Sequence, residues 1–318
     1  MKKHLSKRLY TIISFIVCNI YLTGCVLNID QKKANKMLTN DYCAIPIQSE
    51  INPSKTSIKE LDKINPDLLR RIGIENSELI QSIGLIEPLI KLSISESSTV
   101  NLNKENKTEA LMDVNQKLML ARDIIGEITG ELDCEAVRAT RIRDYLASLG
   151  TKRNNNLTIA AIFSGAVTGL APLVIKNQNP QNAVVIAGSA LSAALGVAVL
   201  TNNKKKVEFL HERNLLGEIW NTPGDRKYLP DFIWTMLTSK IDQSANSISD
   251  LQRIRNRWSK LELSGMDKKQ EKVLFGQGGT YTQDELSTRI SLLNELSTEI
   301  RLLNIRMTKL SLILNDRK

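Results

Sequence analysis

The sequence contains few of the residues that usually carry chemistry. Among its 318 residues, only His4 and His211 are histidines and only four residues are cysteines. A zinc site needs several His, Cys or carboxylate ligands, so a histidine-based site is excluded and the thiols are too few for a thiolate site. Acid–base catalysis by histidine would depend on His211, which we expect on a helix surface beside Glu212 and Arg213. Aromatic residues make up 4% of the chain, which suits a thin helical bundle better than a thick globular core.

Other catalytic patterns are missing as well. The stretch Phe275–Tyr281 contains three glycines but lacks the Gly-Lys-Ser/Thr ending of a phosphate-binding loop. The simplest interpretation is a tight turn before a helix. The carboxylate pair Asp284 and Glu285 falls at a predicted helix N-terminus, where negative charge is favourable. We therefore expect no enzymatic activity, no metal site and no cofactor.

The N-terminus carries a targeting pattern. Four basic residues precede the apolar stretch 9–22, which is shorter than the roughly 20 residues of a transmembrane helix. The sequence Leu22-Thr23-Gly24-Cys25 that follows resembles the lipobox of bacterial lipoproteins. This resemblance implies cleavage before Cys25 and acylation of Cys25, and two or three acyl chains anchor a protein stably. A plain secretory signal peptide is the alternative.

The residue after the cysteine predicts the destination. In Gram-negative lipoproteins an aspartate at that position commonly causes retention at the inner membrane, and here it is Val26. The resemblance therefore implies an outer-membrane lipoprotein of the cell envelope, facing the periplasm or the surface.

Removal of residues 1–24 takes away four Lys/Arg residues and changes the charge of the chain. The mature chain then carries 39 basic and 34 acidic groups, a formal charge of +5 instead of +9. Most support for a nucleic-acid partner disappears with the signal peptide, and we expect none. Besides the anchor, Cys43 and Cys134 remain. In an oxidising compartment we expect a disulfide between them, two unpaired thiols being the alternative.

Periodic apolar residues predict an all-α fold, an elongated antiparallel helical bundle or coiled coil that includes an apolar, glycine-rich helical hairpin. The clearest helix covers residues 110–149, and the last helix follows a capping box at Thr282 and Glu285. The stripe of the first helix consists of Leu111, Val114, Leu118, Ala121, Ile125, Ile128, Leu132, Ala136, Ala139, Leu146 and Leu149. We expect its charged residues to form a solvated outer face: Asp133, Glu135, Arg138, Arg141, Arg143 and Asp144.

The remaining segments are assigned from shorter patterns. Helices are expected at 201–220, 230–241 and 247–263, an irregular segment at 264–281, and no strand. A first capping box is possible at Ser57 and Glu60. We expect chain breaks at Asn65-Pro66, Gly73, Gly84 and Pro88, and the three tryptophans in the core. The predicted organisation is a signal peptide at 1–24, a lipidated tether and loop at 25–56, a helical region at 57–150, the hairpin at 151–206 and a second helical region at 207–318.

The hairpin comes from two apolar runs, Leu157–Ile175 and Ala183–Leu200, joined by a turn at Asn179-Pro180. Each run as a helix would span roughly 27 Å, close to the hydrocarbon thickness of a bilayer. Small residues recur at every fourth position and allow two helices to approach closely: Ala161, Gly165 and Gly169 in the first run, and Gly188, Ser192 and Gly196 in the second.

Two features argue against simple insertion of the hairpin. Only eight of the eighteen residues in the second run are Leu, Ile or Val, so this run should insert weakly. The flanks carry five basic residues and the turn only Lys176, which opposes the positive-inside rule for a hairpin inserted from the periplasm. Three states remain: a hairpin buried in the bundle, a membrane-inserted hairpin, and a hairpin that switches between the two.

The arrangement of long amphipathic helices around one apolar hairpin is similar to that of α-helical pore-forming toxins of the cytolysin A type. Two function hypotheses follow; a third, an enzyme of the cell envelope, needs a pocket that the sequence does not reveal. The first is a non-enzymatic envelope lipoprotein that is bound to the bilayer through Cys25 and contacts a protein partner, or further copies of itself, through its helical surfaces. The second is a membrane-inserting or pore-forming protein that acts through residues 157–200.

Overall fold

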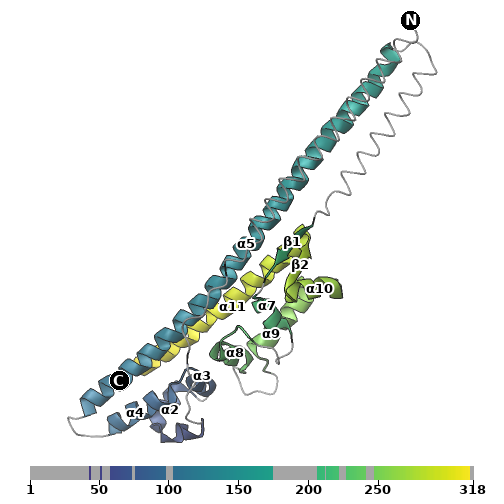
Figure 1. Ribbon diagram of the computed structural model, residues 1–318. Helices are drawn as coiled ribbons and strands as arrows, with labels where there is room; N and C mark the ends of the chain where they lie inside the picture. The colour runs from purple at the N-terminus through teal and green to yellow at the C-terminus, as the bar shows by residue number, and fades with distance from the viewer. Residues whose placement is uncertain are drawn as a thin grey trace. The chain divides into compact units, whose positions relative to one another are not determined.

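The computed structural model describes residues 43, 51, 58–73, 76–97, 103–174, 206–211, 213–221, 227–240 and 247–315 (Figure 1). The chain divides into two compact units. The larger unit consists of Tyr42–Ala147 and His211–Lys318, and the smaller unit of Met1–Asp41 and Ser148–Leu210. The fold is all-α, as the periodicity predicts. Two strands of four residues each also occur, and the prediction of no strand is therefore wrong.

Two long antiparallel helices form the centre of the larger unit. Helix α5 spans Asn103–Val174, of which the part up to Ala147 belongs to this unit, and helix α11 spans Gln283–Asn315. The hydrogen bonds between the two helices show their antiparallel direction. Arg122 bonds Thr308, whereas Asp133, which is later in α5, bonds Ser297, which is earlier in α11. Most of the predicted stripe of α5 is buried: Val114, Leu118, Ala121, Ile125, Ile128, Leu132, Ala136, Ala139 and Leu146.

Helix α11 begins as its sequence predicts. The backbone N–H of Thr282 donates to Glu285 Oε2 at 2.6 Å, and the N–H of Glu285 donates to Thr282 Oγ1 at 3.2 Å. This reciprocal capping box satisfies two N–H groups that the first helical turn leaves without partners. One face of the helix is buried through Leu286, Leu293, Leu296, Ile300, Leu303, Met307, Leu310 and Leu314.

Four short helices lie in the N-terminal part of the larger unit: η1 (Ile58–Lys63, a 3₁₀ helix), α2 (Pro66–Ile72), α3 (Ser77–Ser82) and α4 (Ile86–Ser97). The predicted break at Asn65-Pro66 is confirmed, because Asn65 caps α2 by accepting from the N–H of Asp67. Gly73 and Gly84 also break the chain, with φ angles of 83° and 73° that favour glycine. The predicted break at Pro88 is wrong: α4 runs through it, because Pro88 lies in the first turn, where a missing N–H costs no helical hydrogen bond. Ser57, of the first capping box, lies outside the described residues.

The C-terminal part contains α7 (Leu215–Trp220), α8 (Asp231–Thr238), α9 (Asp250–Arg257), the π-helical η4 (Trp258–Glu262), α10 (Lys268–Phe275) and strand β2 (Gly278–Tyr281). Helix α8 packs against α3 and α9, and α7 packs against α10. The prediction of an irregular segment at 264–281 is wrong. Asp267 caps α10 in a capping box with Gln270, but the short charged helix buries only Leu274 and Phe275 and so lacks a clear apolar period.

In the smaller unit, α5 continues beyond the predicted end of its helix at residue 149, and strand β1 spans Val207–Leu210. The predicted helix at 201–220 is therefore wrong at β1, where burial alternates residue by residue: Val207 and Phe209 are buried, while Glu208 and Leu210 are exposed.

The first apolar run lies in α5 up to Val174, and residues 175–205, with the turn and second run of the predicted hairpin, lie outside the described residues. In the part of the chain that the structure describes, no helix combines the length and the apolar composition needed to cross a bilayer.

Candidate functional site

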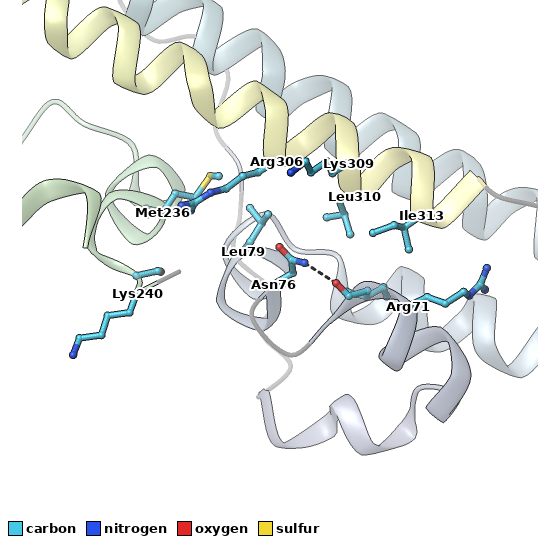
Figure 2. Close-up of a pocket in the computed structure, with 11 residues that line it drawn as sticks. Arg71, Asn76, Leu79, Met236, Lys240, Arg306, Lys309, Leu310 and Ile313 are labelled. Carbon is cyan, nitrogen blue, oxygen red and sulfur yellow. Dashed lines mark hydrogen bonds between the residues drawn. The ribbon is translucent and has the colours of Figure 1, made fainter. Parts of the chain in front are cut away.

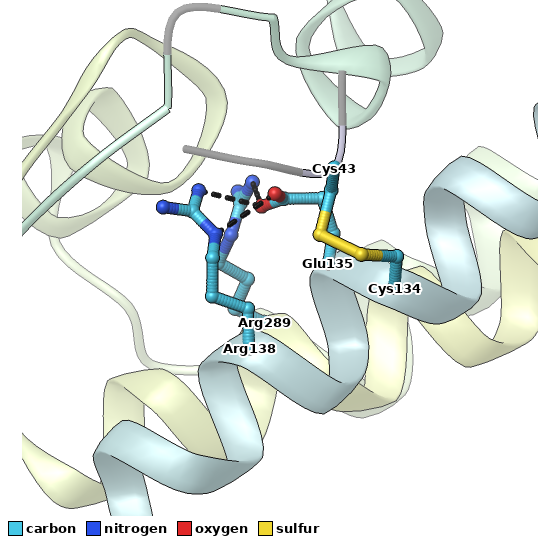
Figure 3. Close-up of a disulfide and its surroundings, with 5 residues drawn as sticks. All are labelled: Cys43, Cys134, Glu135, Arg138 and Arg289. Atoms are coloured by element: carbon cyan, nitrogen blue, oxygen red, sulfur yellow. Dashed lines mark hydrogen bonds and ion pairs between the residues drawn. A yellow bond between two sulfur atoms is a disulfide. The ribbon is translucent and has the colours of Figure 1, made fainter. Parts of the chain in front are cut away.

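A disulfide joins Cys43 to Cys134 near the middle of α5 (Figure 3). The two Cα atoms lie 5.6 Å apart although 91 residues separate them in the sequence. Cys43 is 1% exposed. Of the two states considered for these cysteines, the structure adopts the disulfide, which holds the chain at residue 43 against the long helix.

A buried ion cluster lies beside this disulfide. Glu135 of α5 accepts two hydrogen bonds from Arg138, one at each carboxylate oxygen and both 2.9 Å long, and Arg289 of α11 lies 3.7 Å from the same carboxylate (Figure 3). Glu135 is 5% exposed, and each arginine is 1% exposed. The prediction that Glu135 and Arg138 belong to a solvated face is therefore wrong. Their charges are tolerated inside the protein because they are paired and hydrogen-bonded.

Arg289 connects the ion cluster to the C-terminal elements. Its Nη1 donates to the carbonyl of Leu274 at 3.1 Å and to Asn214 Oδ1 at 3.4 Å. The amide of Asn214 donates in turn to the carbonyls of Leu274 and Gly276, at 3.0 and 2.7 Å. These bonds satisfy carbonyl groups at the end of α10, so one buried arginine ties α5, α10 and α11 together.

His211 is fully buried, and the prediction of a helix-surface histidine is wrong. Its Nε2 lies 2.9 Å from the hydroxyl of Tyr281, which donates to the carbonyl of Val273 at 2.9 Å. The phenol has one proton, and since it is directed to Val273, the imidazole must donate through Nε2.

Burial shifts the pKa values of both groups in this pair. Desolvation, followed by the positive charges of Arg289 and Arg138, lowers the pKa of His211 to about 2. Desolvation also raises the pKa of Tyr281 to about 12. Both groups are therefore neutral between these values, and the hydrogen bond holds His211 against β2.

Two further carboxylates fix loops of the larger unit. Glu131 of α5, which is 2% exposed, accepts from Arg213 Nε at 2.7 Å, and the guanidinium of Arg213 lies 5.0 Å from the ring centre of Tyr228. Glu218 of α7 accepts from three consecutive backbone N–H groups, those of residues 227–229, at 2.5–2.8 Å. These buried and half-buried carboxylates therefore hold Arg213 and the backbone of residues 227–229 in place.

Three aromatic rings stack where α7, η4 and α10 meet. Phe275 lies 5.0 Å from Trp220 and 6.1 Å from Trp258, centroid to centroid, with interplanar angles of 14° and 19°. Trp258 is fully buried, as predicted, whereas Trp220 and Trp234 are half-buried. The rings form the core of the C-terminal elements.

The other predicted site residues lie in the smaller unit. Ala161, Gly165 and Gly169 are in helix α5, whereas Cys25, Gly188, Ser192 and Gly196 lie outside the described residues. Among the residues of known placement, no group of three or more His, Cys, Asp or Glu side chains is arranged to hold a metal ion.

Comparison with known proteins finds no match. No family model, no curated protein and no solved structure is significantly similar to this chain. Its function must therefore be argued from its own residues.

Proposed function

We propose that this chain is a lipid-anchored protein of the bacterial cell envelope with a non-enzymatic, structural or interaction role. In this proposal acylated Cys25 holds the protein at the outer membrane. The larger unit serves as a rigid helical scaffold, and the apolar runs between residues 157 and 200 contact a bilayer or helices of a partner. The lipobox resemblance supports the anchor, and the disulfide suits an oxidising compartment outside the cytosol.

One observation carries the contact role: apolar side chains at the start of the first run are exposed. Ile159 and Ile162, in the smaller unit, are 59% and 66% exposed on α5. Burying such a side chain is worth about 1.5–3 kcal/mol. Exposed apolar side chains at the start of a long apolar run favour an environment supplied from outside the chain, either lipid or another protein.

Cysteine labelling tests this contact in cells. After signal cleavage, Cys25 is acylated and Cys43 and Cys134 are joined, so a single new cysteine is the only free thiol. Ile159→Cys and Ile162→Cys are expected to react slowly with a membrane-impermeant maleimide in intact envelopes. Ile305→Cys is the matched control, because Ile305 of α11 is 52% exposed. Equally fast labelling at residues 159 and 305 would contradict the proposed contact.

The anchor is tested separately. A Cys25→Ala chain whose signal peptide is still removed should leave the membrane fraction for the soluble fraction. Full retention in the membrane fraction would mean that the acyl chains do not determine the location.

The second candidate function is membrane insertion or pore formation by the same runs. The exposure of Ile159 and Ile162 also favours this function, because both side chains are accessible to a bilayer. The mature Cys25→Ala chain would then release a dye trapped in liposomes, and Gly165→Leu would reduce the release by preventing close helix approach. No release by the folded chain would reject pore formation and leave the scaffold role.

A further inference from the structure

A cavity of about 290 Å³ lies in the larger unit between α2, α3, the end of α8 and the C-terminal part of α11 (Figure 2). Its size is close to the lower end of the range for small-molecule sites, roughly 300–1,000 Å³. Figure 2 shows Leu310 and Ile313 pointing down from α11, with Leu79 and Met236 to the left of Leu310.

The inner walls of this cavity are apolar. Ile72, Leu79, Met236 and Leu310 line it and are at most 6% exposed, whereas Ile313 is half-buried at the opening. These side chains come from four helices: α2 and α3 are neighbours in the sequence, and α8 and α11 follow much later. An alkyl chain of a ligand would find contacts on several sides.

The ionisable residues that line the cavity are all cationic: Arg71, Lys240, Arg306 and Lys309. Arg306 is committed to the protein, because its Nη2 bonds Asp250 Oδ2 at 3.0 Å. Lys240 and Lys309 form no ion pair with any described residue. Arg71 and Lys240 extend outward on opposite sides of the opening in Figure 2.

Two carboxylates of described residues bond residues that line the cavity. Asp250 is shared between Arg306 and Arg253, and the carboxylate of Glu78 accepts from the hydroxyl of Ser239 at the edge of the cavity. Among the described residues, the opening therefore combines Lys240 and Lys309 with the exposed carboxylate of Glu78. An apolar interior with a cationic rim complements a molecule that has an apolar body and a single negative head.

We propose that this cavity binds a fatty-acid-like amphiphile, an alkyl chain that ends in a carboxylate. The alkyl chain lies among Leu79, Met236 and Leu310, and the carboxylate remains at the rim, within reach of Lys309 and Lys240. The proposal does not depend on the lipid anchor or on the role of residues 157–200.

Calorimetric titration of the full mature chain with Cys25→Ala tests this proposal without competing acyl chains or detergent. Butyrate, hexanoate and octanoate form the first series. Burial of methylene groups predicts that affinity rises about fifteen-fold for each two-carbon step until the cavity is full. 1-Octanol, which has a similar chain but no charge, should bind at least ten-fold more weakly than octanoate.

Variants locate the binding. Ile313→Trp fills the opening and should weaken octanoate binding at least ten-fold, whereas Ile305→Trp on the same helix lies outside the cavity and should not. Lys309→Glu should weaken octanoate at least five-fold and leave octanol unchanged, and Lys260→Glu, an exposed lysine elsewhere, is its control. If Ile313→Trp does not fold, the Lys309→Glu comparison decides.

Three results would overturn the proposal. Equal affinities for octanoate and octanol would indicate apolar binding without recognition of charge. Equal affinities for butyrate and octanoate would indicate an anion site without an apolar component. Binding of a peptide that ends in leucine carboxylate, without binding of octanoate, would assign the cavity to a polypeptide partner.

Discussion

The buried His211 makes a quantitative prediction for acid stability. In an unfolded chain a histidine has a pKa of about 6.5, whereas desolvation and two nearby arginines lower the pKa of His211 in the folded chain to about 2. Between these values the unfolded state binds a proton that the folded state does not. The contribution of His211 to stability is therefore fully present above pH 6.5 and is lost as the pH falls toward 2.

The size of the effect follows from the pKa difference. At pH 4.5 the unfolded-state histidine is two pH units below its pKa, and each unit corresponds to about 1.36 kcal/mol, so the loss is about 2.7 kcal/mol relative to neutral pH. Other groups also titrate in this range. A variant that changes only residue 211 separates the histidine from them.

The assay is urea unfolding followed by tryptophan fluorescence at pH 7.5 and pH 4.5. Glutamine at position 211 does not titrate, and its amide can still donate to Tyr281. The free energy of unfolding of the wild type should therefore fall by about 2–3 kcal/mol more than that of His211→Gln over this interval. Tyr281→Phe keeps the histidine and should retain its pH dependence. If the wild type and His211→Gln lose equal stability, the histidine is not held neutral by burial, and the argument from its environment is refuted.

Two further predictions concern the scaffold. Replacing Cys43 and Cys134 by serine opens a loop of about 90 residues. Loss of this cross-link should lower the free energy of unfolding, measured in urea, by about 4–5 kcal/mol, because the unfolded chain gains conformational entropy. An unchanged free energy of unfolding would mean that contacts other than the disulfide hold residue 43. Gly217→Ala should destabilise the fold by about 1–3 kcal/mol, because its Cβ would overlap the carbonyl oxygen of Phe275. Gly126→Ala should stabilise the fold by about 0.5–1 kcal/mol, because open space surrounds that helical position. Equal thermal midpoints for the two variants would contradict the packing at Gly217.

Long-period features of this chain could be read from its sequence. The stripe of α5 and the apolar face of α11 extend over many turns, so their periods identify amphipathic helices that pack together. The capping box at Thr282 and Glu285 and the breaks at Gly73 and Gly84 depend on neighbouring residues only, and local chemistry is sufficient to predict them.

The buried ion cluster and the burial of His211 could not be predicted from sequence periodicity. Glu135 and Arg138 look like a solvated pair on a helix, because their burial depends on Arg289, which is more than 150 residues away in the sequence. Likewise, the environment of His211 depends on Tyr281, 70 residues later. The sequence carries little signal for strand β1: burial alternates along Val207–Leu210, but Phe209 and Leu210 are both apolar, and four residues are too few to outweigh the surrounding helical pattern.

Under the proposed lipid anchor, the disulfide would also limit how far residue 43 can move from the membrane. If Cys25 carries the acyl chains, 18 residues connect the anchor to Cys43, and even a fully extended chain of that length reaches only about 60–65 Å. If the disulfide were reduced and η1 were then the first restrained element, the tether would extend to Ile58, 33 residues from the anchor. The maximum reach would then be about 110–120 Å. Under the proposed anchoring, one covalent bond thus sets the maximum distance between the lipid anchor and the point where the tether joins α5.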